Sequence, residues 1–152
     1  MIKNIGIEMS QEIFYALKGQ KVVFLTTYSD KGMPHLTPIS VVYPKSRESI
    51  LIALLSDTLA YKNMVWQKKV VLSIIEGNGL VVHIVGRAGV VRAPSHIHPD
   101  IHIAQIDVID IMTEDSLLIT IESGVKWKHV SGEMKALHDA LVKELQECVH
   151  AV

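Results

Sequence analysis

The chain has 152 residues, of which 49% are hydrophobic and 20% are charged, so it is about one domain long and is not a disordered protein. Its 15 basic and 16 acidic residues leave a net charge of −1, which argues against nucleic acid or a membrane surface as a partner. Cys148 is the only cysteine, which excludes a disulfide framework within the chain.

The apolar residues come in short runs, and none is long enough to span a bilayer. Residues 1–10 contain no signal-peptide core, so we expect a soluble, cytoplasmic protein with one domain over residues 1–152. The mean hydropathy of +0.29 is high for such a protein. Part of the surplus apolar surface must be buried, and a subunit interface is the natural place for it.

The first predicted element is a short helix at Gln11–Lys18, with Ser10 as its cap. The pattern then changes to that of strands. Lys21–Ser29 is rich in β-branched and aromatic residues, and after the turn at residues 30–32 the chain returns as a second strand at His35–Tyr43.

Ser49–Leu55 is an apolar run that predicts a buried strand, and a helix over Thr58–Lys68 follows it. Val70–Glu76 and Leu80–Arg92 predict two further strands. The Asn78-Gly79 pair between them favours a tight hairpin turn.

Two more strands are expected at Ile101–Met112 and Leu117–Lys128. The tail, Ser131–Val152, repeats apolar residues at helical spacing and predicts a C-terminal helix at about residues 131–150. Hairpin-length connections favour antiparallel pairing, and several strands are apolar on both faces. The predicted fold is therefore mainly β, a β-barrel of about six to seven antiparallel strands with flanking helices.

The segment from Ser56 to Lys62 lies where a buried strand ends and a helix begins. Free backbone N–H groups, the hydroxyls of Ser56 and Thr58 and the charge of Lys62 would suit a phosphate. Asp57 would oppose such an anion. The alternative is that Thr58 or Asp57 only caps the helix and that Lys62 is solvated.

Pro38 lies inside a predicted strand although it has no N–H to donate. It marks either an edge or bulge of the sheet, or a gap in the hydrogen-bond ladder where a flat ligand meets the backbone. Thr37 and Ser40 flank the break and could supply hydroxyls.

The segment SHIHPDIH brings together His96, His98 and His102, but Pro99 interrupts their spacing and no acidic or cysteine partner stands at a metal-motif offset. A solvated loop is therefore favoured over a metal site, and no metal is predicted. No nucleophile–base motif is present, and the catalytic residues are unknown. Any chemistry would then belong to a cofactor.

The order of four segments resembles the FMN-binding split-barrel family related to pyridoxamine 5′-phosphate oxidase. These segments span about residues 21–92 and read VVFLTTYSDKGMPHLTPISVVY, SILIALLS, YKNMVWQKKVVLSI and HIVGRAGVV. The resemblance implies a split barrel and a homodimer with two FMN molecules at the subunit interface.

The resemblance also implies where FMN binds. The phosphate would lie near the start of the helix after the third strand, and Asn63 and Met64 match the family's Asn-Leu pair there. The flavin ring would lie along the second and third strands, near Thr37, Pro38, Ile39, Ala53 and Leu54.

The basic residue that the family places three positions before this Asn falls on Ala60. Lys62, Lys68, Lys69 or Arg87 could replace it; otherwise the site could hold a deazaflavin or haem. Trp127 could reach the partner's cofactor, or could pack under the terminal helix.

The function that the resemblance implies is a flavin-dependent oxidoreductase with a small-molecule substrate. The alternatives are a non-catalytic flavin carrier or sensor, and a haem-binding or deazaflavin-binding barrel. Among the histidines, His83 would be a haem candidate, although a structural role is more usual for a single strand histidine.

Overall fold

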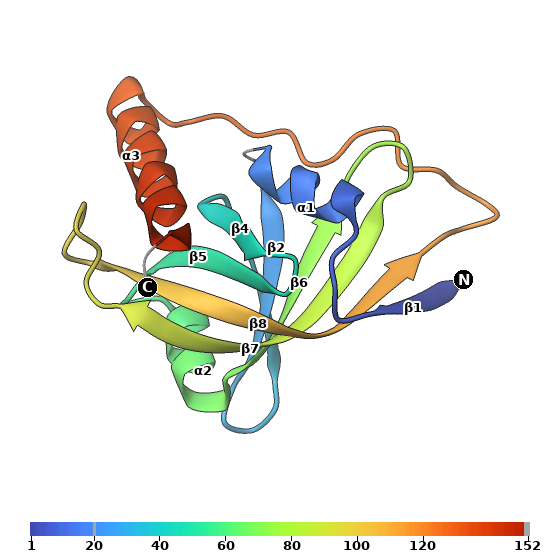
Figure 1. The fold of residues 1–152 in the computed structure, drawn as a ribbon, viewed down its shortest axis with the longest axis horizontal. Helices are drawn as coiled ribbons and strands as arrows, with labels where there is room; N and C mark the ends of the chain where they lie inside the picture. Colours follow the sequence, from blue (N-terminus) through green and yellow to red (C-terminus); the bar gives the residue numbers. More distant parts are fainter. Residues whose placement is uncertain (20, 151–152) are drawn as a thin grey trace.

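The computed structural model describes residues 1–19 and 21–150, in which an eight-stranded antiparallel sheet is joined by three helices (Figure 1). The strands are β1 (Ile2–Gly6), β2 (Val23–Tyr28), β3 (Pro34–Ile39), β4 (Val42–Ser46), β5 (Ser49–Leu55), β6 (Lys69–Ile75), β7 (Val81–Arg92) and β8 (Ile101–Glu114). The helices are α1 (Gln11–Lys18), α2 (Leu59–Gln67) and α3 (Gly132–Val149).

The strand order is β3-β2-β6-β7-β8-β5-β4, with β1 added along β8. β3 and β4 follow each other in the chain with only residues 40 and 41 between them, yet they stand at opposite ends of this order. The sheet must therefore curl until its two ends lie near each other. This arrangement is the predicted split barrel, with the split between β3 and the β4–β5 pair.

The predicted hairpin between β6 and β7 is confirmed. Its turn places Asn78 at φ 63° and Gly79 at φ 73°, the two successive positive angles of a tight hairpin turn. The pairing then runs without interruption from Ile75 opposite Val81 to Lys69 opposite Arg87.

Alternation along the strands divides the apolar residues between two cores. Leu25, Ile52, Leu72, Ile84 and Ile106 point into the barrel, where they meet side chains of α1 and α2. The opposite face of β5 and β8 packs beneath α3 in a second cluster. β5 is apolar from its second residue, Ile50, to its end because it contributes to both cores, and the prediction at Ser49–Leu55 matches its bounds.

The predicted strand His35–Tyr43 is in fact two strands. β3 pairs with β2 as far as Ile39, whereas β4 begins at Val42 and pairs with β5. Between them the chain passes from one end of the sheet to the other, and the Val41 carbonyl already accepts a hydrogen bond from the Ala53 N–H at 3.1 Å.

The predicted strand Leu117–Lys128 is wrong, because residues 115–131 form no strand and cross from β8 to α3 as an irregular segment (Figure 1). Its backbone meets the β6–β7 hairpin through glycines instead of through a ladder. A Cβ on Gly77 would lie 2.7 Å from the Glu122 carbonyl oxygen, and one on Gly124 would lie 2.7 Å from that of Ile75. Leu117 and Leu118 are left fully exposed.

The C-terminal helix is confirmed, with Ser131 as its N-cap and Gly132–Val149 as its span. The end of the predicted range, residues 151 and 152, lies outside the described residues. None of the helices in the described ranges is long and apolar enough to cross a membrane.

Candidate functional site

A cavity of about 580 Å³ opens at the split of the barrel. Its walls come from β3, the end of β5, the start of α2, and single residues of β8 and α3. Six of the residues proposed from the sequence line it: Thr37, Pro38, Ile39, Ala53, Leu54 and Thr58. The cavity is within the usual size range of a site for a small molecule or cofactor.

β3 supplies one wall of the cavity as an edge strand. Its inner neighbour is β2, with Pro38 opposite Phe24, and no strand among the described residues pairs with its other side. The edge interpretation of Pro38 is thus confirmed, and the edge also faces the cavity. Because an edge strand carries unpaired N–H and C=O groups, this wall can hydrogen-bond a ligand through its backbone.

The start of α2 forms the floor of the cavity, and Thr58 is the N-cap of this helix. The Thr58 hydroxyl accepts a hydrogen bond from the Tyr61 N–H at 3.3 Å and donates one to the Leu55 carbonyl at 2.7 Å. The single proton of the Thr58 hydroxyl is therefore engaged with the Leu55 carbonyl, and this residue acts as a helix cap, the alternative to a phosphate ligand. Ser56 lies in the preceding turn, outside the cavity lining, where its N–H donates to the Asp100 carbonyl.

The basic residues proposed for the phosphate lie outside the cavity lining. Lys62 is exposed on the outer side of α2, whereas Ala60 is buried and does line the cavity. Among the described lining residues none is Lys or Arg, and His35 on β3 is the only one with a titratable side chain.

Asn63 is buried, and its amide nitrogen donates to the Thr27 hydroxyl at 3.2 Å. Thr27 is itself fully buried on β2. This pair joins α2 to the sheet inside the barrel, so the Asn63 side chain has a structural partner and is not part of the cavity lining.

Trp127 lies against the N-terminal half of α3. Its ring centre is 5.0 Å from that of His129 and 5.8 Å from that of His138, in agreement with the packing alternative. His138 is buried, and neither of its ring nitrogens makes a hydrogen bond of acceptable geometry with any residue of the described ranges. Burial lowers the pKa of His138, and the neighbouring His129 lowers it further, although the Ser40 backbone partly opposes this.

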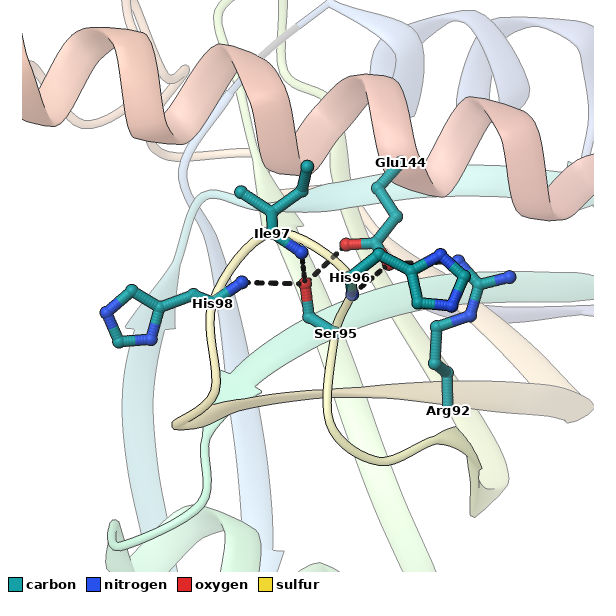
Figure 2. A network of polar contacts seen from close by, with 6 residues as sticks. All are labelled: Arg92, Ser95, His96, Ile97, His98 and Glu144. Atoms are coloured by element: carbon teal, nitrogen blue, oxygen red, sulfur yellow. Dashed lines mark hydrogen bonds and ion pairs between the residues drawn. The ribbon is translucent and has the colours of Figure 1, made fainter.

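A buried carboxylate, Glu144, fixes the loop after β7 to α3 (Figure 2). It accepts hydrogen bonds from the Arg92 guanidinium at 2.9 Å, from the His96 N–H at 2.8 Å and from the Ser95 hydroxyl. Burial alone would raise the pKa of Glu144, but these donors and the charge of Arg92 outweigh it and lower the pKa. The network holds α3, and with it Leu141 of the cavity wall, against the sheet.

The same network explains the histidine-rich loop. His96 and His98 take part through their backbone N–H groups, and the latter donates to the Ser95 hydroxyl at 3.4 Å. His102 instead makes a side-chain hydrogen bond with the Tyr61 hydroxyl at 2.7 Å. Within the described ranges no three His, Cys, Asp or Glu side chains gather as metal ligands would.

Sequence reasoning missed Glu144, His138 and the role of Ala60 as a wall of the cavity. Glu144 and His138 lie on a helix whose sequence pattern indicates only which face is apolar. Arg92, which forms the ion pair with Glu144, is 52 residues away in the sequence. The one available sign was the place of Glu144 in the sequence, directly before Leu145 and three residues after Leu141, both of which are core residues.

Residues 9–100, more than half of the chain, match the model of the pyridoxamine 5′-phosphate oxidase family. The chain belongs to this family. No curated protein matches the sequence at a significant level.

Many solved structures share this fold, and three of them illustrate the range. One is a protein of Lactobacillus delbrueckii designated a pyridoxamine 5′-phosphate oxidase, with TM-score 0.63 and 16% identity over 72% of this chain and 98% of that chain. An FMN-binding protein of Syntrophomonas wolfei has a TM-score of 0.58 and 12% sequence identity, and the match covers 68% of this chain and 84% of that chain. The haem storage protein HutZ of Vibrio cholerae has a TM-score of 0.53 and 12% sequence identity, and the match covers 66% of this chain and 90% of that chain. Identities this low establish the shared fold alone.

Proposed function

We propose that this chain is an FMN-binding flavoprotein and acts as a flavin-dependent oxidoreductase, with the flavin in the cavity at the split of the barrel. The observation that carries the proposal is the unpaired edge of β3 along a cavity of about 580 Å³. Membership of the family and an FMN-binding structural neighbour support it.

The walls of the cavity suit the ring system of a flavin. Ile39, Ala53, Leu54 and Ile101 give apolar surface against which a flat ring can lie. The β3 edge offers backbone donors and acceptors to the polar rim of that ring, and the hydroxyls of Thr37 and Ser40 lie on the same wall.

When bound, FMN would accept a hydride or an electron pair from a reduced nicotinamide or a substrate and pass it on. The protein's own part would be to hold the ring, to exclude water with Leu54 and Leu141, and to place backbone groups of β3 where they adjust the electronics of the ring.

The proposal includes a homodimer that covers the mouth of the cavity. Leu55 and Leu59 line the cavity and are 48% and 53% exposed, so a second subunit placed there would bury apolar surface beside the ligand. Light scattering on Leu59→Glu should then give a monomer in place of a dimer. A monomeric wild-type protein would contradict this part of the proposal.

The test of the proposed function begins with the visible spectrum of the purified protein and the effect of added FMN on the melting temperature. Bound flavin should give a yellow protein, and FMN should raise the melting temperature by mass action. A colourless protein that excess FMN leaves unchanged would refute the proposal. Stopped-flow reduction by NADH and NADPH then separates an oxidoreductase from a non-catalytic carrier or sensor.

Haem is the second candidate, and His35 favours it because this imidazole lines the cavity. Haem iron is commonly held by a histidine. A haem spectrum that is lost in His35→Ala, with no flavin bound under any condition, would support this candidate over the first.

A further inference from the structure

We infer that the cavity recognises the flavin through its ring system and not through its phosphate, so that riboflavin binds about as tightly as FMN. This inference rests on the proposed function, since it concerns which part of the flavin the same cavity recognises.

A phosphate dianion needs charged or strongly polar donors, usually Arg or Lys together with backbone N–H groups. The described lining of the cavity contains neither Lys nor Arg. Two residues of the first turn of α2 line the cavity, Leu59 and Ala60; both are apolar, and Ala60 is the buried one. A phosphate at this place would meet a methyl group where a cation is needed.

The N-terminus of α2 offers few hydrogen-bond donors that could replace the missing cation. The Thr58 hydroxyl donates to Leu55 and accepts from the Tyr61 N–H, which leaves the N–H groups of Leu59 and Ala60 as the donors of this turn. Asp57, just before the cap, adds a carboxylate to the same turn. A carboxylate there offsets the positive end of the helix dipole that an anion would otherwise use.

The other cations near α2 lie too far along it. Lys68 is the C-cap of the helix, roughly 15 Å from Thr58 at 1.5 Å per residue. Lys69 and Arg87 face each other across β6 and β7 at that same end. Lys62 lies closer, but its side chain is exposed and outside the cavity lining.

The ring and its sugar-alcohol chain, by contrast, find matching surfaces. The apolar walls and the β3 edge act on the tricyclic ring, which riboflavin and FMN share. The hydroxyls of Thr37 and Ser40 are neutral partners for a neutral hydroxylated chain. The two ligands therefore differ only in a group for which the described lining of this cavity contains no cation.

The experiment titrates the purified protein with riboflavin and with FMN and follows quenching of flavin fluorescence. We expect the two Kd values to agree within about threefold, and the FMN value to change little from low to high salt. Lys62→Ala should leave their ratio unchanged. FMN tighter than riboflavin by about tenfold or more, or a selective loss of FMN affinity in Lys62→Ala, would overturn the inference.

Ala60→Lys supplies the missing cation and tests the position directly. It should tighten FMN by about tenfold and leave riboflavin unchanged. Val65→Lys is the matched control, because it adds the same charge to α2 at a position that is 49% exposed and outside the cavity lining. An equal effect of both variants on FMN would overturn the assignment of Ala60. If neither flavin binds the wild-type protein, the proposed function itself fails.

Discussion

Glu144 on α3 accepts a hydrogen bond from Arg92 at the end of β7 at 2.9 Å, and its side chain is almost completely buried. This contact joins the last helix to the end of a long central strand. It also fixes the loop that leads to β8, because the Ser95 hydroxyl and the His96 N–H donate to the same carboxylate.

Glu144→Ala should lower the free energy of unfolding by about 3 kcal/mol, because it leaves Arg92 and two further donors without their acceptor. Urea unfolding followed by circular dichroism measures the loss. Glu147→Ala, at an exposed position of the same helix, is the control and should change stability little. Equal losses in the two variants would show that the buried network contributes nothing.

His138 should make the protein less stable in mild acid. Its pKa is lowered in the folded state, first by burial and then by His129, from an ordinary value of 6.5. As the pH falls through that value the unfolded chain takes up a proton that the folded chain does not yet bind, so the free energy of unfolding decreases.

Replacement of His138 by Phe should remove part of this pH dependence. The measurement is the melting temperature from about pH 7 down to about pH 5, in wild type and in the variant. His150→Phe, which removes an exposed histidine from the end of α3, should keep the wild-type slope. A His138→Phe protein with an unchanged slope would contradict the prediction.

Asn63→Ala should destabilise the protein by about 1–3 kcal/mol, because the Thr27 hydroxyl is left buried without its partner. Asn63→Leu combined with Thr27→Val removes both polar groups and should be less harmful than the single change. Thermal unfolding gives both values. A normal melting temperature with loss of flavin binding in Asn63→Ala would instead place this amide on the cofactor.

Ala53→Leu should weaken flavin binding, because Ala53 lines the cavity and a larger side chain there takes up part of its volume. The flavin titration of the wild-type protein is repeated with the variant, and its melting temperature shows that it still folds. Ala136→Leu makes the same change at an exposed position of α3 and should bind as wild type does. Full affinity in Ala53→Leu would remove the cavity from consideration.

Local signals in the sequence predicted much of the fold. The Asn78-Gly79 turn, the Ser10 cap and the apolar run Ser49–Leu55 each act over a few residues, and the structure contains all three. β1 was missed because its pairing with β8 joins residues more than 100 positions apart and its own five residues carry little pattern. The segment Leu117–Lys128 has a strand-like composition, but it pairs with no strand in the part of the chain that the structure describes.

The same distinction holds for the site. The sequence indicated the corner where β5 gives way to α2 and the break at Pro38, both of which border the cavity. It did not show that the Thr58 hydroxyl donates to the Leu55 carbonyl or that the Asn63 amide donates to Thr27. Nor did it show that Lys62 is exposed and lies outside the cavity lining. These facts depend on how α2 sits on the sheet, which no local pattern encodes.

The most direct test of the account is a crystal structure of the protein grown with FMN. We predict the flavin ring at the split of the barrel, with one face against Ala53 and Leu54 and its polar rim along the edge of β3. A flavin bound elsewhere, or a cavity closed by side chains while the protein stays colourless, would contradict it.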